Sequence, residues 1–200
     1  GRSVQVPSLI FKNEDWKENI KRGAKAFFLL FPSKNRLHDK AKEYIKIGES
    51  KEINKLYKCR MRDEWHIVPS AWISDALFIR RNNIYPRLII NQARAYTTDT
   101  MHRVTLNKNQ KLDGSNKVNM NSFVASYYNS LSLAFAEICG RSHGGGVLEL
   151  MPNEVEDILV PYDERNAKLL EKIEKMFRNG KNIDDILKKI GYPGETMGER

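Results

Sequence analysis

Four short segments rich in β-branched and aromatic residues lie between residues 65 and 106, with turn residues between them. These segments are 65–68, 76–80, 87–91 and 102–106. Pro69, Pro86 and the pair Asn82 and Asn83 separate them. Short runs bounded by proline and asparagine are typical of strands joined by loops. This region therefore predicts a compact sheet, and the polar residues 107–117 predict a loop.

Residues 119–139 carry the clearest helical periodicity in the chain. The residues that share its apolar stripe are Phe123, Tyr127, Leu131, Ala134, Phe135 and Ile138. Asn121 or Ser122 can cap the start of such a helix, and Gly140 can end it. One continuous helix is the expectation here.

The remaining segments add shorter elements. The apolar run 26–31, stopped by Pro32, predicts a buried strand, and the segment from Ser33 to about residue 47 predicts a helix that ends at Gly48. Residues 147–150 alternate like a strand. The further helices predicted are one that opens at Pro152, one over 163–178, and one capped by Asn182 that ends at Gly191. Together these elements predict an α+β fold: a small mixed or antiparallel sheet flanked by helices, with a helical C-terminal end.

The charge of the chain is unevenly distributed. The net charge is +9, because the chain has 34 Lys and Arg residues and 25 Asp and Glu residues. Residues 1–111 hold 23 basic and 11 acidic side chains, a net of +12, whereas residues 112–200 hold 11 and 14, a net of −3. Such asymmetry indicates a polyanionic partner, most simply nucleic acid. A merely basic, solvated surface is the alternative.

The composition is that of a globular chain in a reducing compartment. The two cysteines, Cys59 and Cys139, form no disulfide framework and favour a cytoplasmic location. No run approaches the roughly 18 consecutive apolar residues of a membrane span, and the N-terminal residues lack the pattern of a secretory signal.

Two segments gather residues suited to contacts with DNA. In 58–65, Lys58 precedes Arg60 and Arg62, which would point to one face of a strand and suit phosphates or guanine edges. An exposed basic strand that contacts nothing is the alternative. In 94–103, the polar candidates between two apolar strands are Arg94, Thr97, His102 and Arg103. A satisfied turn with a structural histidine is the alternative there.

The segment 141–146 combines Arg141, Ser142 and His143 with three consecutive glycines. Glycines let a backbone approach a partner closely and adopt positive φ, so a loop that contacts phosphate or bases is one interpretation. A tight structural connection is the other. The context does not fit a nucleotide-binding loop, because the segment follows a helix, precedes a strand and lacks the required lysine.

Several catalytic patterns are absent from the sequence. It contains no Gly-x-Ser-x-Gly, no His-Glu-x-x-His, no Cys-x-x-Cys and no convincing set of nuclease carboxylates with lysine. An enzyme that works alone is therefore difficult to build from these residues.

Four segments, taken in order, resemble a known family. They are 44–49, 57–69, 85–104 and 129–161, and the most specific part is Gly-Arg-Ser-His-Gly-Gly-Gly-Val-Leu-Glu-Leu-Met-Pro at 140–152. Residues 25–162 resemble the C-terminal part of adenine-specific N6 DNA methyltransferases of restriction–modification systems. These are enzymes of the TaqI type, with gamma-class organisation, an N-terminal catalytic domain and a C-terminal target-recognition domain.

This resemblance implies how the chain is divided into segments and which function each domain of the parent enzyme has. Residues 1–24 would lead in from the catalytic domain, 25–161 would form the target-recognition domain, and 162–200 would form a C-terminal helical segment. The family's catalytic signature, Asn/Asp-Pro-Pro-Tyr/Phe, and its Phe-x-Gly-x-Gly cofactor loop are both absent. The resemblance therefore implies a specificity domain that is inactive alone, from a bacterial or archaeal cytoplasmic enzyme, with S-adenosylmethionine held by the catalytic domain.

The expected partners are double-stranded DNA and the catalytic domain of the same parent chain, with no membrane. The candidate DNA-binding residues, assigned by charge and position, are Lys58, Arg60, Arg62, Arg94, Thr97, His102, Arg103, Arg141, Ser142 and His143. Two alternatives stay open. One is a restriction nuclease or bifunctional restriction–modification module. The other is a protein-interaction module that uses the apolar stripe Leu169, Leu170, Ile173 and Phe177, although packing of this stripe on its own domain is favoured.

Overall fold

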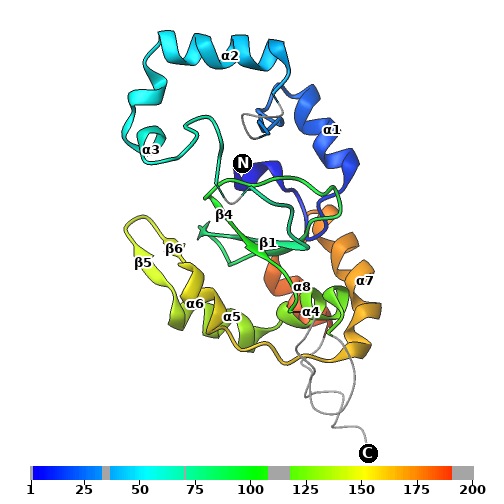
Figure 1. Cartoon of the computed structure of the whole chain (residues 1–200). Helices are drawn as coiled ribbons and strands as arrows, with labels where there is room; N and C mark the ends of the chain where they lie inside the picture. The colour runs from blue at the N-terminus through cyan, green and yellow to red at the C-terminus, as the bar shows by residue number, and fades with distance from the viewer. Residues whose placement is uncertain (1, 33–36, 70, 108–117, 191–200) are drawn as a thin grey trace, which may run out of the picture. The chain divides into compact units, whose positions relative to one another are not determined.

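The computed structural model describes residues 2–32, 37–69, 71–107 and 118–190 (Figure 1). The chain divides into two compact units: unit 1 comprises Gly1–Ala26 and Ile73–Arg200, and unit 2 comprises Phe27–Trp72. Helices combine with two small antiparallel sheets, so the predicted α+β class is confirmed. The division into 1–24, 25–161 and 162–200 concerns function and stays a prediction.

Unit 1 contains both sheets. Its helices are η1 (Ser3–Gln5), α1 (Asn13–Lys21), α4 (Met120–Tyr127), α5 (Ser130–Cys139), α6 (Pro152–Glu156), η4 (Glu164–Asn166), α7 (Ala167–Arg178) and α8 (Ile183–Ile190). Its strands are β1 (Ala76–Ile79), β2 (Arg81–Asn82), β3 (Leu88–Ile90), β4 (Met101–Val104), β5 (Arg141–His143) and β6 (Val147–Glu149). The strands predicted at 76–80, 87–91, 102–106 and 147–150 are thus confirmed within a residue or two.

The first sheet, in the order β3-β1-β4, is buried on both faces. In β1 the side chains alternate between two hydrophobic clusters. Ala76 and Phe78 join the larger cluster beneath the helices, whereas Leu77 and Ile79 join a second cluster with Val6 and Phe11 from the N-terminal segment. This two-sided burial explains why β1 is apolar at every position.

The N-terminal segment extends this sheet beyond β3. Ile10 forms a parallel bridge with Ile90, Phe11 N–H donates to the Ile90 carbonyl at 2.9 Å, and Ile90 N–H donates to the Leu9 carbonyl at 2.8 Å. The Arg87 guanidinium donates to the Val6 carbonyl. Residues 6–11 are therefore part of the core of unit 1.

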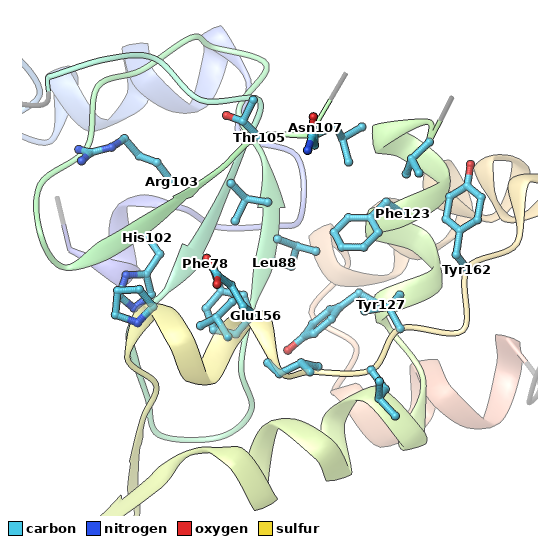
Figure 2. A pocket seen from close by; sticks show the side chains of 18 residues that line it. Phe78, Leu88, His102, Arg103, Thr105, Asn107, Phe123, Tyr127, Glu156 and Tyr162 are labelled. Carbon is cyan, nitrogen blue, oxygen red and sulfur yellow. The ribbon is translucent and has the colours of Figure 1, made fainter. Parts of the chain in front are cut away.

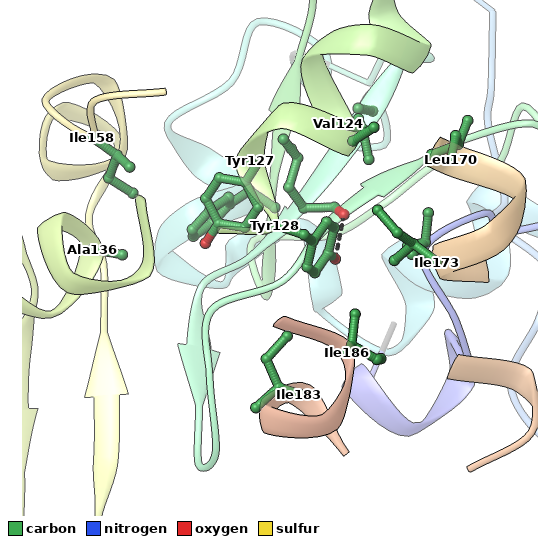
Figure 3. Close-up of a cluster of buried hydrophobic side chains, with 14 of the residues drawn as sticks. Val124, Tyr127, Tyr128, Ala136, Ile158, Leu170, Ile173, Ile183 and Ile186 are labelled. Atoms are coloured by element: carbon green, nitrogen blue, oxygen red, sulfur yellow. Dashed lines mark hydrogen bonds between the residues drawn. The ribbon is translucent and has the colours of Figure 1, made fainter. Parts of the chain in front are cut away.

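The helix expected over 119–139 is instead two helices, α4 and α5. The break falls at Tyr128 and Asn129, where the Asn129 side chain accepts from Ser132 N–H at 2.9 Å and caps α5. The buried Tyr128 hydroxyl donates to the Leu88 carbonyl at 2.7 Å, which ties the break to β3 (Figure 3). The apolar periodicity is present in both helices, but a capping residue inside a helical stripe starts a new helix. The predicted caps Asn121 and Ser122 are wrong, because Asn119 is the N-cap of α4, whereas Gly140 follows α5 as predicted.

The C-terminal helices pack on the same core. Leu170 and Ile173 of α7 and Ile183 and Ile186 of α8 are buried beside α4 (Figure 3). The Asn182 side chain accepts from Asp185 N–H at 2.7 Å, which confirms its predicted capping role. The apolar stripe of α7 is therefore satisfied within unit 1.

Unit 2 contains α2 (Asp39–Ser50), η3 (Ile53–Lys55) and α3 (Tyr57–Arg60), and its described residues include no strand. The strands expected at 26–31, 58–65 and 65–68 are therefore wrong. The described run 26–31 forms no strand, and its Phe27 is 77% exposed. Residues 33–36, 108–117 and 191–200 lie outside the described residues, and so do the predicted helix start at Ser33, most of the predicted loop and the end at Gly191.

The predicted helix stop at Gly48 is also wrong, because α2 continues to Ser50. Gly48 lies inside the helix, where a Cβ atom would come within 2.4 Å of the Trp65 indole. The glycine therefore makes room for the Trp65 indole.

A buried ionic network joins the N-terminal segment to α7. Arg178 donates to both carboxylate oxygens of Asp15 at 2.8 Å, and it also bonds Glu174. Glu174 in turn accepts from Ser8 Oγ at 2.6 Å and Ile10 N–H at 3.1 Å. Desolvation raises the pKa of Asp15, but the hydrogen bonds from Arg178 and Lys12 N–H and the nearby positive charges outweigh it, so that the pKa is lowered.

Removal of Arg178 should destabilise unit 1 strongly. In Arg178→Ala, Asp15 and Glu174 stay buried without their cation, and breaking such a pair lowers the free energy of unfolding by about 3 kcal/mol. Urea unfolding measures this loss. The matched control is Arg165→Ala, which breaks an exposed pair with Asp163 and should change stability by less than about 1 kcal/mol. Equal losses in the two variants would contradict the structural role of Arg178.

The stability contributed by the Asp15 carboxylate should disappear in acid. Because its folded pKa lies below the ordinary 3.8, this contribution is fully present above the unfolded pKa and is lost as pH falls through the folded pKa. Urea unfolding of the wild type and of Asp15→Asn should therefore differ most near neutral pH. The difference should shrink as pH falls below 3.8. A difference independent of pH would contradict the assignment.

Candidate nucleic-acid interface

The segment 141–146 forms half of a β-hairpin rather than the irregular loop expected from the sequence. β5 pairs with β6 in antiparallel register, Arg141 opposite Glu149 and His143 opposite Val147. The glycines form the turn, and Gly145 and Gly146 adopt φ of 79° and 73°. Such angles are strained for other residues, which explains the glycine run. Because the turn joins two antiparallel strands and no helix follows it, it does not provide the strand–loop–helix cradle of a nucleotide site.

The strand β2 completes a second sheet in the order β2-β6-β5. Arg81 and Arg141 both lie opposite Glu149, one on each neighbouring strand, so these three residues form a row across the sheet. His143 lies two residues beyond Arg141 and therefore on the same face. The hairpin extends from the body of unit 1 (Figure 1), and all three residues of β5 are exposed.

Glu149 is the centre of this face. Its buried carboxylate lies 2.8 Å from Arg80 Nε, 3.0 Å from Arg81 Nε and 2.9 Å from His143 Nε2. Desolvation raises the pKa of Glu149, but the hydrogen bond and charge of Arg81, the charge of Arg80 and the bond from His143 outweigh it and lower the pKa. The carboxylate thus stays ionised and fixes three cationic or polar side chains.

A second carboxylate fixes Arg141. Its Nε donates to Glu154 Oε1 at 2.6 Å, and the other oxygen of Glu154 accepts from Met151 N–H at 2.7 Å at the start of α6. The Met151 bond, together with the bond and charge of Arg141, lowers the pKa of Glu154. We call the face formed by Arg80, Arg81, Arg141, His143, Glu149 and Glu154 the arginine face.

The candidates of segment 94–103 occupy different environments. Arg94 is exposed with φ of 52°, Thr97 is buried, and His102 Nε2 lies 2.7 Å from the Leu150 carbonyl. Asn91 holds the preceding turn through bonds with both polar groups of the Ala95 backbone. Thr97 and His102 are thus built into the fold, and Arg94 presents its side chain at the surface.

His102 and Arg103 also border a pocket of about 620 Å³ in unit 1. Phe123 and Tyr127 of α4 face Leu88 and Phe78 across it, and Arg103 extends away from these rings (Figure 2). The pocket lining is mainly apolar, and none of the other candidate DNA-binding residues is part of it.

The candidates in unit 2 do not share a strand face, because their segment is helix α3 followed by turns. Lys58 and Arg60 are exposed, with the Arg60 guanidinium 5.6 Å from the centre of the Tyr57 ring. Arg62 is half-buried and donates to the carbonyls of Trp65 and Ile67 at 3.3 Å each. Arg62 therefore stabilises the turn that follows α3, and the expectation that Arg60 and Arg62 share one face of a strand is wrong.

The sequence predicted Arg141 and His143, which lie on the arginine face, and Ser142, which lies between them in β5 with its side chain on the other face. It did not predict four further residues of the arginine face. These are Arg80, Arg81, Glu149 and Glu154. The consecutive arginines at the end of a predicted strand were a usable signal. Their meeting with Glu149, 68 residues further along the chain, depends on strand pairing that the sequence pattern did not reveal.

Residues 1–192 match the family model described as "Type II methyltransferase M.Eco57I, C-terminal domain", and the chain belongs to that family. The family resemblance expected from the sequence is thereby confirmed.

A curated relative agrees with this placement. The chain is 23% identical over 193 residues to the type II methyltransferase M.AccI of Acinetobacter calcoaceticus, which covers 90% of this chain and 34% of that protein. The chain thus spans about a third of the length of this relative. No solved structure matches.

The described residues contain no group of three or more His, Cys, Asp or Glu side chains placed to bind a metal ion. None of the helices in these ranges is long and apolar enough to cross a membrane.

The hairpin turn should require glycine at position 145 but not at position 144. Both positions are open to a Cβ atom, and only Gly145 has a positive φ. Gly145→Ala should therefore weaken the hairpin by about 1 to 2 kcal/mol, and the matched control Gly144→Ala should not. Hydrogen exchange of the amides in β5 and β6 measures the change. Equal protection in the two variants would contradict the turn geometry.

Proposed function

We propose that this chain is the target-recognition domain of an S-adenosylmethionine-dependent DNA adenine N6-methyltransferase of a restriction–modification system. In this proposal the chain binds double-stranded DNA and selects the sequence. Methyl transfer and S-adenosylmethionine binding belong to a catalytic domain elsewhere in the parent protein. The same assignment makes the catalytic domain a partner of this chain.

The observation that carries the proposal is the exposed hairpin with its arginine face, in a chain of the M.Eco57I C-terminal domain family. A two-stranded β-ribbon fits the major groove of B-DNA, where each base pair presents a distinct pattern of donors and acceptors. Arg81 and Arg141 lie on one face of such a ribbon and its neighbouring strand. The hairpin thus combines a suitable shape with side chains that donate hydrogen bonds.

The charge distribution supports the same proposal. The basic excess of residues 1–111 suits the phosphate backbone, and exposed cations such as Lys58, Arg60 and Arg94 can supply contacts that do not depend on sequence. Turning an adenine out of the duplex costs a few kcal/mol, so the enzyme needs a firm hold on the flanking DNA. A recognition domain provides this hold while the catalytic domain acts on the base.

The test is duplex binding by the full-length protein that carries this chain. Affinity for duplex DNA should fall steeply with salt, with a slope of about −0.9 for each phosphate contact. Arg141→Ala should weaken binding by about 1 to 3 kcal/mol without a change in melting temperature. Arg165→Ala, an exposed arginine paired with Asp163 away from the arginine face, is the matched control and should bind like the wild type.

Fluorescence anisotropy with labelled duplexes measures both effects. A folded wild-type protein without duplex affinity at low salt would overturn the proposed function. Normal binding and normal melting of Arg141→Ala would remove the hairpin from the interface.

A further inference from the structure

On the arginine face, Arg81 and Arg141 are each bound by a carboxylate at the same atom of the guanidinium, Nε. Arg81 Nε lies 3.0 Å from Glu149 Oε1, and Arg141 Nε lies 2.6 Å from Glu154 Oε1. A carboxylate on the Nε–H edge leaves the end edge of the group, formed by the two Nη atoms, directed away from the carboxylate. Both side chains are 65% exposed, whereas Arg80, deeper in the cluster, is 27% exposed and places Nη2 3.4 Å from Met151 Sδ.

Within the part of the chain that the structure describes, the hydrogen bonds of Arg81 and Arg141 run from Nε alone. The end edge of each guanidinium, with one N–H from each Nη atom, thus makes no hydrogen bond in this part of the chain, and each side chain is 65% exposed. Restraint by a carboxylate also reduces the side-chain entropy that binding would otherwise remove, because arginine is among the side chains with the most rotamer freedom. These two arginines are prepared to bind a planar acceptor pair.

Based on the proposed function, we propose that Arg81 and Arg141 each read a guanine in the major groove of the target DNA. Guanine presents two acceptors, N7 and O6, on one edge, and an arginine can bond both at once. Glu149 and Glu154 act as positioning residues that hold the Nε edges. The preferred substrate is therefore a site with guanine at two defined positions.

The charges of the arginine face favour a base over a phosphate. Three arginines and two ionised carboxylates lie together, so the carboxylates offset most of the positive charge. A phosphate oxygen that approached Arg81 or Arg141 would also approach Glu149 or Glu154 and be repelled. The acceptor edge of a guanine has no net charge, so the carboxylates repel it far less than they repel a phosphate.

The two arginines should read different positions of the site. Arg81 and Arg141 flank Glu149 on opposite sides, so their backbones are two strand spacings apart, roughly 10 Å. Base pairs in B-DNA follow one another at about 3.4 Å. Each arginine therefore specifies a separate base pair.

The experiment is selection of binding sites from a random duplex library by the full-length protein, in the wild type and in Arg81→Lys and Arg141→Lys. Lysine keeps the charge but cannot bond N7 and O6 in the fixed two-pronged geometry of arginine. Each variant should lose the guanine preference at one position, a different one for each, and keep the rest of the site. The matched control Arg165→Lys should select the wild-type site.

A second measurement tests the guanine contact directly. Arg141→Lys should identify one guanine position that the variant no longer selects. Placing 7-deazaguanine at that position removes the N7 acceptor and leaves base pairing intact. Wild-type affinity should fall roughly tenfold, and that of Arg141→Lys should hardly change. The same comparison with Arg81→Lys and its own position gives an independent result if one variant fails to fold.

The outcomes separate the two proposals. Uniform weakening over all sequences, with no position relaxed, would mean phosphate contacts and would overturn the guanine assignment while the proposed function stands. A wild-type site without guanine at the relaxed positions would overturn it too. Failure of the folded wild-type protein to select any duplex would instead refute the proposed function.

Discussion

Burial of β1 on both faces is the constraint on which unit 1 depends. A strand with apolar side chains on both faces is stable only when each face is covered. The helices α4, α7 and α8 contribute to the cluster on one face, and Val6 and Phe11 of the N-terminal segment contribute to the cluster on the other. The ionic network of Arg178, Asp15 and Glu174 then joins the N-terminal segment to α7, so that the covers of the two faces are bonded to each other. The second sheet begins where β1 ends, because Arg80 follows β1 directly and β2 starts at the next residue.

The arginine face depends on one buried carboxylate in a similar way. Glu149 lies opposite Arg81 on one strand and Arg141 on the other, and it also contacts Arg80 and His143. An isolated carboxylate in this position would be costly to bury, and the surrounding cations compensate for its desolvation. The requirement works in both directions, since Glu149 fixes the orientation of Arg80, Arg81 and His143. The fourth side chain, Arg141, is held by Glu154. The contacts that compensate for the burial of the Glu149 carboxylate are therefore the same contacts that orient the arginine donors at the surface.

The sequence predicted the elements of unit 1 better than those of unit 2. Strands β1, β3, β4 and β6 and helices α6, α7 and α8 follow from local pattern, because their apolar residues face a core at regular intervals. Two failures are local: Asn129 starts a new helix inside one stripe, and the apolar run 26–31 forms no strand although its composition resembles one. Of the candidate site, the hairpin residues were found from composition and glycine content. Arg81 and Glu149 were not, because strand pairing between distant segments has no signature in either segment alone.

The insertion of unit 2 has a consequence for how the chain folds. Ile10 pairs with Ile90, so the sheet closes between positions 80 residues apart, and the whole of unit 2 lies within that loop. Contacts of such long sequence separation slow folding, because chain entropy is lost before the contact forms. The entropy of closure grows with the length of flexible chain in the loop. Any compaction of 27–72 before the N-terminal segment docks shortens that effective length, so the order in which the two units become compact sets the rate at which the first sheet is completed.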